Sequence, residues 1–512
     1  MTKTKRIQIL CLLGAVTLLL SGCWTEAPVE SANGLLGDQE PADQQEEVIL
    51  PAAFTLPYDP DQTLDPVTCA DGMQQVAGSL IYEGLFRLDR QLEPQPWLCQ
   101  SYTYDAASLT YTFTLRSGVT FSDGSPLTAA DAAATLRRAK SSQRYSARLA
   151  HVAAVSAGDG VVIVTLSRPD SSLPALLDIP IVKSGTEESL TPVGTGPYYF
   201  TTDEAGACLA SHSGWWRGES RPAERIALSA ARDREAILYQ FSSHEVQLIT
   251  ADLIGTEPIT ATGNISYEDA DTTVLQFLGF NTARAPFQDS AARRALGLGI
   301  NRETLVSAVL SGHARAAQFP VSPVSPLYPA ELESLYSYDD FAAAMEAAGL
   351  NTGRTRTVTL LVNQENTFKV SAAEHIAQAL SDFDLQIQVE ALPWEEYAAA
   401  LAAGNFDLYY GEVRLPANWD LSALVGTGGS LNYGGWADPQ TEQRLAACAA
   451  AEDRAAALSD LCAYLQQQAP ILPLCFKSSS VLYQTGAVSG LTPTAAEPFY
   501  DLPSCQIHLR QP

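Results

Sequence analysis

The second half of the chain alternates between segments with the composition of strands and segments with the periodicity of helices. The strand-like segments are residues 357–362, 385–389 and 406–410, and the helix-like segments are residues 370–380 and 394–403. This β-α-β-α-β order predicts a parallel sheet covered by helices, and therefore an α/β fold. Ligands of such sheets contact the loops at the carboxyl ends of the strands. We therefore expect a binding site in the segment after Tyr410.

Local patterns predict further elements in both halves of the chain. The predicted strands are residues 109–116 and 161–166, and the predicted helices are residues 129–140 and 440–468. Apolar and polar residues alternate strictly over residues 109–116, which is typical of a half-buried strand. Thr128 and Asp131 have the spacing of a capping box at a helix start. The long alanine-rich helix is expected to end before Pro470.

The beginning of the chain has the order of a secretory signal. Basic residues at Lys3, Lys5 and Arg6 precede a mostly apolar run over residues 7–20. This run is too short to cross a bilayer comfortably. The next residues, Leu20-Ser21-Gly22-Cys23, resemble the lipobox of bacterial lipoproteins. The resemblance implies that residues 1–22 are removed and that Cys23 receives a diacylglyceryl group and further acylation such as palmitate. An ordinary signal peptide cut elsewhere and a short membrane helix are the alternatives.

An acidic segment separates this signal from the rest of the chain. Residues 24–50 contain several Asp and Glu residues but neither Lys nor Arg. Such a composition cannot offset chain entropy by burying apolar surface, so residues 23–50 are predicted to be a disordered tether. No later apolar run is long enough to cross a membrane. We therefore expect an extracytoplasmic body that is held to the cell membrane by its lipid alone.

The composition of the body excludes some classes of function. The formal net charge of the chain is −27, which argues against nucleic acid and against lying flat on anionic lipid. The cysteines show no C-x-x-C spacing, so a zinc or redox site is not expected. Seven cysteines follow Cys23, and they are expected to be mostly buried, with one or two disulfides possible. They are Cys69, Cys99, Cys208, Cys448, Cys462, Cys475 and Cys505.

Motifs spread from Leu50 to the end of the chain resemble the family 5 extracellular solute-binding proteins of ABC importers, the group that includes oligopeptide, dipeptide and nickel binders. The matching segments are residues 64–66 (LDP), 81–86 (IYEGLF), 111–116 (YTFTLR), 119–131 (VTFSDGSPLTAAD), 192–198 (PVGTGPY), 278–282, 293–296, 300–303, 394–397, 404–408, 432–433, 438–439 and 469–474. In this resemblance Gly194-Thr195-Gly196 is a structural turn. It is no phosphate-binding loop, because no lysine follows it.

The resemblance implies a two-lobed α/β clamshell of the type II periplasmic-binding-protein class, with an extra subdomain on the first lobe. The implied boundaries are residues 51–268 for the first lobe, about 76–184 for its subdomain, 269–477 for the second lobe and 478–512 for the return to the first lobe. Lobe closure around a small solute would stabilise the closed population. The implied partners are a peptide or other small solute and an ABC permease, and the protein is expected to be a monomer without a cofactor.

The predicted ligand site centres on the segment from Gly411 to Asp420. In the family's peptide binders the corresponding loop carries an aspartate that binds the ligand's ammonium group. Here Pro416 occupies that place, and Asp420 is the nearest acid. Glu412 and Arg414 share one face of an extended segment, and Arg can hold a carboxylate bidentately. The predicted ligand-binding residues are Asn281, Tyr410, Glu412, Arg414, Trp419, Asp420, Asn432 and Tyr433. The alternative is that Glu412 and Arg414 pair with each other and that the aromatic residues belong to the core.

Other functions fit the sequence less well. The chain has no G-x-S-x-G elbow and no H-E-x-x-H pair, and its six histidines are scattered, so a hydrolase is disfavoured, although paired carboxylates could still act. A metal-chelate or haem carrier would be expected to show clustered His or Met. A ligand-dependent sensor could use the same fold, and the sequence does not separate it from an importer. Peptides are the leading ligand class, and modified amino acids and opine-like compounds remain alternatives.

Overall fold

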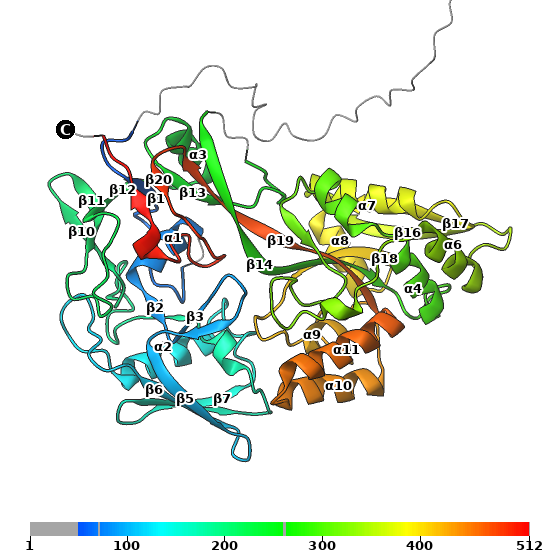
Figure 1. The fold of residues 1–512 in the computed structure, drawn as a ribbon, viewed down its shortest axis with the longest axis horizontal. Coiled ribbons are helices and arrows are strands. Elements are labelled where there is room, and N and C mark those ends of the chain that lie inside the picture. The colour runs from blue at the N-terminus through cyan, green and yellow to red at the C-terminus, as the bar shows by residue number, and fades with distance from the viewer. Residues whose placement is uncertain (1–49, 70–71, 260–262, 511–512) are drawn as a thin grey trace, which may run out of the picture. The chain divides into compact units, whose positions relative to one another are not determined.

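The computed structural model describes residues 50–69, 72–259 and 263–510. The predicted signal peptide, the lipidation site at Cys23 and all of the predicted tether except Leu50 lie outside these residues. The described residues form one seven-stranded sheet, two four-stranded sheets and three two-stranded ladders. Helices accompany both the seven-stranded sheet and the four-stranded sheets (Figure 1). The fold is therefore of mixed α/β type, as predicted.

The seven-stranded sheet contains the β-α-β-α-β unit that the sequence predicts. The unit consists of β16 (Arg356–Asn363), α7 (Thr367–Ala379), β17 (Leu385–Leu392), α8 (Trp394–Ala402) and β18 (Leu408–Arg414). β16 pairs in parallel with both β17 and β18. The remaining pairs of this sheet are antiparallel, so the sheet is mixed and not purely parallel. β18 begins later than predicted and continues to Arg414, so the expected loop after Tyr410 is still strand.

Two apolar cores lie on opposite faces of this sheet. Leu360, Leu408 and Tyr410 belong to the first core, with residues of α4 (Ser290–Leu298), α6 (Tyr338–Ala347) and α7. Leu361 and Tyr409 belong to the second core, with residues of α8, of α10 (Pro439–Ala450) and of α11 (Arg454–Gln468). Because successive strand residues face opposite sides, neighbouring residues divide between the cores. The sheet is thus covered on both faces, as the composition of its strands predicts.

The long helix predicted over residues 440–468 is in fact two helices. α10 spans Pro439–Ala450 and α11 spans Arg454–Gln468. Asp453 caps α11 by accepting a hydrogen bond from the Ala456 amide at 3.1 Å, a side-chain signal for a new helix start within the alanine-rich segment. The two helices then pack against each other, with an ion pair between Arg444 and Asp460 at 3.0 Å. The predicted end before Pro470 is confirmed.

Two long strands run through the sheet next to each other. β14 (Ile265–Phe280) pairs antiparallel with β19 (Ile471–Gln484) over most of its length, with a register shift between Asp271 and Leu275 (Figure 1). One end of β19 also pairs with β13 (Leu248–Ala251). Through β19 and β14, the strand β13 therefore belongs to the same sheet as the β16–β18 unit.

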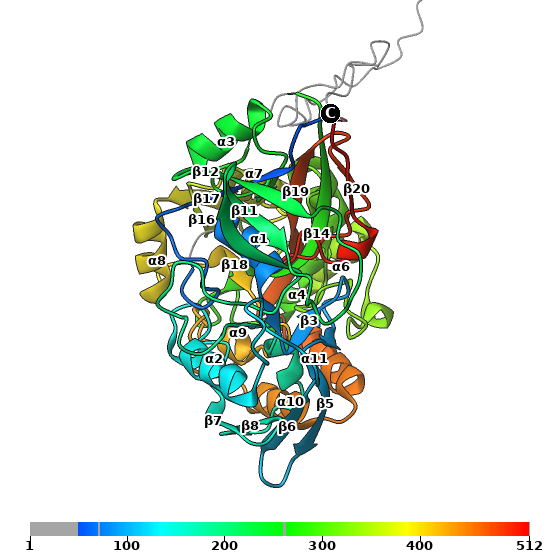
Figure 2. The same cartoon turned by 90° about the vertical axis from the view of Figure 1, so that its left-hand side faces the viewer.

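The strands predicted near residues 109–116 and 161–166 form a separate sheet of order β5-β6-β8-β7. Its strands are β5 (Cys99–Asp105), β6 (Thr110–Leu115), β7 (Val152–Ala157) and β8 (Val161–Leu166), and α2 (Ala129–Ser141) contacts β7 and β8 (Figure 2). Tyr111 and Phe113 on β6 are fully buried, while Thr114 is exposed. The predicted alternation is confirmed. The capping box at the start of α2 is also present, with Thr128 and Asp131 bonded reciprocally.

The other four-stranded sheet has the order β1-β12-β11-β10. The remaining helices and strands include β1 (Thr55–Tyr58), α1 (Gly72–Ile81), β2 (Glu83–Gly84), β3 (Phe86–Leu88), β4 (Pro94–Pro96), β9 (Pro180–Ile181), β10 (Tyr198–Asp203), β11 (Gly206–Ser211), β12 (Arg225–Ala230), α3 (Arg234–Ser242), α5 (Arg302–Thr304), β15 (Ala314–Ala316), α9 (Ser422–Val425), β20 (Val488–Ser489) and β21 (Gln506–Ile507). β20 and β21 pair near the C-terminus. Val488 and Cys505 share a core with Phe54 and Leu56, so the end of the chain returns to the part where the body begins.

A buried carboxylate connects several of the sequence motifs. Glu83, which is 7 % exposed, accepts hydrogen bonds from the indole N–H groups of Trp97, Trp215 and Trp216 at 2.9–3.2 Å and from the Thr195 hydroxyl at 2.7 Å. Burial raises the pKa of Glu83, and the four donors oppose that shift. Its hydrogen-bonding capacity is thus met inside the protein.

The glycine turn at residues 194–196 is confirmed as a packing feature. A Cβ atom added at Gly194 would lie 2.1 Å from the carbonyl oxygen of Ile81, and one at Gly196 would lie 2.7 Å from the same oxygen. The Gly196 amide also donates to Ile81 at 2.8 Å. Glycine is therefore required by the close approach of this turn to the end of α1.

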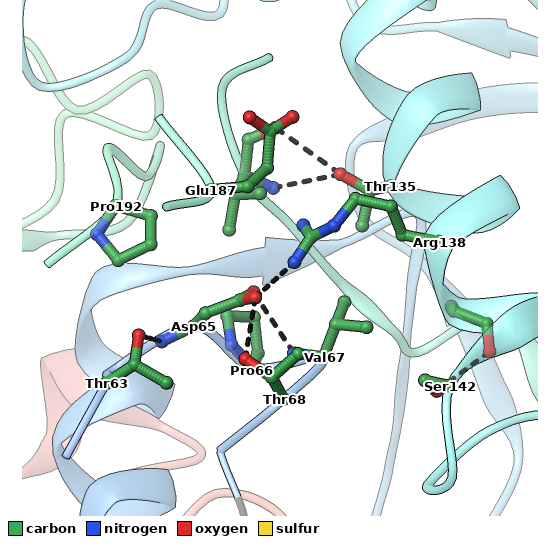
Figure 3. A network of polar contacts seen from close by, with 12 residues as sticks. Thr63, Asp65, Pro66, Val67, Thr68, Thr135, Arg138, Ser142, Glu187 and Pro192 are labelled. Atoms are coloured by element: carbon green, nitrogen blue, oxygen red, sulfur yellow. Dashed lines mark hydrogen bonds and ion pairs between the residues drawn. The ribbon is translucent and has the colours of Figure 1, made fainter. Parts of the chain in front are cut away.

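The Leu64-Asp65-Pro66 motif is explained by a second buried acid. Asp65 is fully buried and its carboxylate accepts hydrogen bonds from the Val67 amide at 3.2 Å and the Thr68 hydroxyl at 2.9 Å (Figure 3). It also forms an ion pair with Arg138 of α2. The motif therefore fixes the segment before α1 against α2.

Within the described residues, the cysteines are buried and the helices are not suited to cross a membrane. All seven cysteines that follow Cys23 are buried, as expected for small apolar side chains. Cys99, Cys208, Cys448, Cys462, Cys475 and Cys505 are free thiols. No helix within residues 50–69, 72–259 and 263–510 combines the length and the apolar character that a membrane crossing requires.

Candidate functional site

The carboxyl end of β18 carries three of the predicted ligand-binding residues on one face. Tyr410, Glu412 and Arg414 alternate along the strand. Tyr410 is buried in the first core, the Glu412 side chain is 24 % exposed, and Arg414 is exposed. Exposure therefore increases along this face of the strand, from the buried Tyr410 to the exposed Arg414, so its polar groups can contact a ligand.

Glu412 lies at the centre of a cluster of charges. The ammonium groups of Lys369 on α7 and Lys477 on β19 each lie 3.3 Å from the same carboxylate oxygen of Glu412. Lys477 forms a second ion pair with Asp252, which follows β13. Three separate segments and β18 therefore bring two ammonium groups and two carboxylates together.

Burial and charge act in opposite directions on this cluster. Burial disfavours the ionised form of Glu412, but Lys369 and Lys477 outweigh it and hold the pKa of Glu412 below its usual value. Burial lowers the pKa of Lys369, and Glu412 opposes that shift. The side chains of Lys369 and Lys477 are only 13 % and 6 % exposed, so these charges interact through a poorly screened environment.

A chain of hydrogen bonds orients Glu412. The Tyr410 hydroxyl donates to Gln276 at 2.7 Å, and the amide of Gln276 donates to Glu412 at 2.9 Å. Gln276 lies opposite Glu412 in the register of β14 and β18 and is fully buried. The buried Tyr410 hydroxyl therefore helps to orient the Glu412 side chain through Gln276.

Arg414 differs from the other charged residues at this edge. Within the described part of the chain, its guanidinium has no hydrogen-bond or ion-pair partner, and it does not pair with Glu412. Arg148 of the N-terminal half lies near enough for the two like charges to interact. Burial lowers the pKa of Arg148 to about 10, and Arg414 contributes to that shift. Arg148 is itself paired with Asp178. Arg414 thus remains available for an external anion.

The structure places Trp419 and Asp420 away from this exposed face. Trp419 is 2 % exposed and packs edge-on against Phe476, with ring centroids 6.0 Å apart. Asp420 forms an ion pair with Arg168 and accepts hydrogen bonds from the amide and hydroxyl of Ser422 at 2.9 and 2.5 Å. The carboxylate of Asp420 is therefore already occupied by groups of the protein.

Asn281 and Asn432 use their amide groups within the fold. The Asn281 side chain donates to Gly404 at 3.0 Å and to Phe406 at 3.2 Å. The Asn432 side chain donates to Gly426 at 2.8 Å and to Trp436 at 2.7 Å. All four acceptors are backbone carbonyl groups, so these amides hold loops at the start of β18.

Tyr433 lies at the same end and is 37 % exposed, with its ring edge-on to Tyr409 at 6.1 Å. Leu408 opens β18 opposite Phe280, the residue before Asn281, whereas Arg414 ends the strand. Six residue steps along a strand correspond to about 20 Å. The structure therefore places Asn281, Asn432 and Tyr433 near the start of β18, and Glu412 and Arg414 towards its end.

Sequence reasoning missed Lys369, Lys477, Gln276 and Asp252. The sequence contained one signal for them, a lysine at position 477 inside the largely apolar strand Ile471–Gln484. A lysine at such a place requires a partner in a folded protein. Its partners Glu412 and Asp252 are distant in sequence, so only the fold identifies them. No group of His, Cys, Asp and Glu in the described ranges could hold a metal ion.

The sequence matches a known protein family and curated relatives. Residues 93–432 match the profile of "Bacterial extracellular solute-binding proteins, family 5 Middle". The chain is 27 % identical over 355 residues to the glutathione-binding protein GsiB of Salmonella paratyphi A, covering 66 % of this chain and 69 % of the relative. It is 28 % identical over 357 residues to GsiB of Escherichia coli K12, with the same coverage.

Solved structures show the same fold at low sequence identity. The substrate-binding protein CtaP of an ABC transporter of Listeria monocytogenes superposes with a TM-score of 0.71 at 17 % identity, covering 90 % of this chain and 99 % of CtaP. A nickel ABC transporter protein of Bacillus halodurans gives a TM-score of 0.72 at 21 % identity, covering 87 % and 98 % of the two chains. The fold is the two-lobed type II periplasmic-binding fold. The profile match covers more than half of the sequence, and the chain belongs to the family 5 bacterial extracellular solute-binding proteins.

Proposed function

We propose that this protein captures a peptide outside the cytoplasm and delivers it, unaltered, to the permease of an ABC importer. The family supports solute binding for import. The observation that carries the choice of a peptide is the charge arrangement at the end of β18. There Glu412 lies between Lys369 and Lys477, and Arg414 is exposed at the end of the same strand face.

This arrangement suits a ligand with charges of both signs. A free peptide carries an ammonium group and at least one carboxylate. Arg414 can hold a carboxylate through two parallel N–H···O bonds. Lys369, Lys477 and Gln276 all meet Oε2 of Glu412, so Glu412 can accept from the ammonium group only through Oε1. The relatives named as glutathione-binding proteins support this class, because glutathione is a tripeptide with free carboxylates. The solved AppA of Bacillus subtilis was obtained in complex with a nonapeptide, so longer peptides belong to the same proposal.

Capture would proceed by closure of two lobes. We place the first lobe at residues 51–268 with its subdomain at about 76–184, the second lobe at 269–477, and the return at 478–512. The register shift between Asp271 and Leu275 in β14 lies beside the first of these boundaries, and irregular pairing is a natural place for strands to bend. A ligand that contacts both lobes shifts the population towards the closed form.

The test of the ligand class has two stages. Native mass spectrometry of the freshly purified protein should first reveal a retained peptide. Isothermal titration with that peptide, or with glutathione and a set of dipeptides and tripeptides, should then show a loss of about tenfold or more in affinity for Arg414→Ala, since hydrogen bonds between charged groups contribute about 1.5–3 kcal/mol.

Arg356→Ala is the matched control, because Arg356 is an exposed arginine at the start of the neighbouring strand β16. It should bind like the unmodified protein. Equal affinity of Arg414→Ala and Arg356→Ala would rule out the proposed placement of the ligand. Absence of binding to any peptide by the unmodified protein would rule out the ligand class.

Anchoring and assembly are proposed on the sequence alone. Lipidation of Cys23 would hold the mature protein at the cell membrane as a monomer. Cys23→Ser should move the protein from the membrane fraction to the soluble fraction, and the membrane-extracted protein should elute as a monomer in size-exclusion chromatography. Uptake of the identified peptide should fall when the gene is deleted, whereas unchanged uptake would indicate that the protein acts in sensing.

A further inference from the structure

Residues 168–172 of the proposed first lobe contact the second lobe directly. The Ser171 amide donates to the Ala449 carbonyl at 2.9 Å, and the Ser171 hydroxyl donates to the Ala451 carbonyl at 2.8 Å. Both acceptors lie at the end of α10. This segment therefore adds a contact between the lobes that is distinct from the strands β14 and β19.

Polar side chains extend this contact on both sides. The Asn418 side chain donates to Asp170 at 3.0 Å, and Arg168 forms an ion pair with Asp420. Arg454, at the start of α11, donates to the Asn418 carbonyl at 2.6 Å. Asp170, Arg168, Asn418, Asp420 and Arg454 thus form one connected group that includes residues of both lobes.

The same residues line a small cavity of about 20 Å³, together with Trp419. The indole N–H of Trp419 and the Nε–H groups of Arg168 and Arg454 are buried and have no hydrogen-bond partner among the described residues. Trp419 itself is almost completely buried, with 2 % of its surface exposed. A buried donor without an acceptor lowers stability. Three such donors belong to residues that line this one cavity, which indicates a bound group that accepts hydrogen bonds.

The size and charge of the cavity select the kind of group. A single water requires roughly 10–15 Å³ of such volume and two to four polar partners, and the volume of about 20 Å³ is enough for one water. The carboxylates of Asp170 and Asp420 balance the guanidinium groups of Arg168 and Arg454. A neutral molecule that both accepts and donates therefore fits better than an anion.

We propose that this cavity binds one ordered water, and that residues 168–172, this water and the Asp420–Arg168 pair form a lock that holds the two lobes together. Only the role of the lock rests on the proposed function. That role is to stabilise the closed population before a solute arrives. In this role Asp420 serves closure and does not bind the ligand.

Hydrogen exchange of the Ser171 amide tests the lock without any ligand, because that amide bonds across the two lobes. In the full chain, Arg168→Ala should raise its exchange rate about fivefold, the effect expected for one partly exposed ion pair. Arg225→Ala is the matched control, since the Arg225–Asp203 pair has similar exposure but lies within the first lobe. Equal exchange in the two variants would overturn the lock.

Trp419→Phe separates a bound water from an unpaired donor. If a water accepts from the indole N–H, its loss should raise the exchange rate of Ser171. If no group binds there, removing an unpaired donor should leave the rate unchanged or lower it, and this result would overturn the water site. A crystal structure of the full chain should show a water within hydrogen-bonding distance of Trp419 Nε1. An anomalous peak at this position after a bromide soak would instead assign an anion and overturn the water.

The ligand-free readout keeps this test independent of the proposed peptide. A protein that binds no peptide can still show the lock, and a protein that binds peptides can lack it.

Discussion

Two buried acids of the N-terminal half of the chain differ from the charged residues at the end of β18 in how their charge is compensated. Asp65 and Glu83 lie in motifs that match the family, and both have their hydrogen-bonding capacity met by protein groups. Glu412 and Arg414 lie shortly before Pro416, the residue at which we expect the sequence to depart from the family's peptide binders. Glu412 is partly exposed among two lysines, and Arg414 is exposed without a partner among the described residues.

This comparison separates motifs that build the fold from residues that can select a ligand. A buried charge must be paired or fully hydrogen-bonded, so its substitution is costly and its role is structural. An exposed and unpaired charge contributes little to folding, and it can change with the ligand. The family motifs therefore predict the fold, whereas the segment around the expected departure at Pro416 remains our prediction for the place that sets specificity.

The largest expected effect comes from Glu83→Ala, which would leave three indole N–H groups and the Thr195 hydroxyl without their acceptor. The free energy of unfolding should fall by about 3–5 kcal/mol, because each unsatisfied buried donor costs about 1–3 kcal/mol and the losses are not additive. Urea unfolding followed by tryptophan fluorescence would measure it. Glu204→Ala, at an exposed site, should leave the transition unchanged, and equal stability of the two variants would break the comparison.

Gly194→Ala should also destabilise the protein, although glycine carries no charge. The added methyl group would meet the backbone of Ile81, which cannot move as a side chain can. We expect a loss of about 2–3 kcal/mol in the free energy of unfolding from overpacking. Gly72→Ala is the control, because nothing lies within 4 Å of a Cβ atom at Gly72. A stable Gly194→Ala protein that retained its fold would show that the turn is not constrained by packing.

Asp65→Asn tests the second buried acid. It retains the size of the side chain but weakens the bond to Arg138, so the free energy of unfolding should fall by about 2 kcal/mol. The exposed pair of Arg232 and Asp61 supplies the control, since both side chains are more than 60 % exposed (68 % and 63 %). Asp61→Asn should not change the thermal midpoint. If Asp65→Asn and Asp61→Asn unfolded at the same temperature, burial would not explain a structural role of Asp65.

Arg414→Lys is the mildest test, and it concerns binding alone. Lysine keeps the charge but cannot form two parallel bonds to a carboxylate. Affinity for the peptide found by native mass spectrometry should fall by about threefold to tenfold, with no change in thermal stability, because Arg414 is exposed. Isothermal titration beside a thermal scan would measure both. A loss of stability would place Arg414 with Asp65 and Glu83 as a structural residue.

The sequence allowed much of the fold to be predicted. Alternation over residues 109–116, the Thr128–Asp131 capping box and the β-α-β-α-β unit were all confirmed, because each depends on contacts between near neighbours. The long helix over residues 440–468 was wrong, since alanine favours helix equally on both sides of the break that Asp453 caps. The extension of β18 to Arg414 was missed, because its pairing with β14 involves residues far away in sequence.

The sequence by itself determined the family, the order of the local elements and the position of Glu412 and Arg414 on one strand face. Only the tertiary structure decided which charges surround Glu412, that Tyr410 and Trp419 are buried, and that Asp420 pairs with Arg168. The physical reason is how far apart along the chain the interacting residues lie. Periodicity, capping and turns are set within a few residues of the chain, whereas an ion pair or a burial depends on segments that only the folded chain brings together.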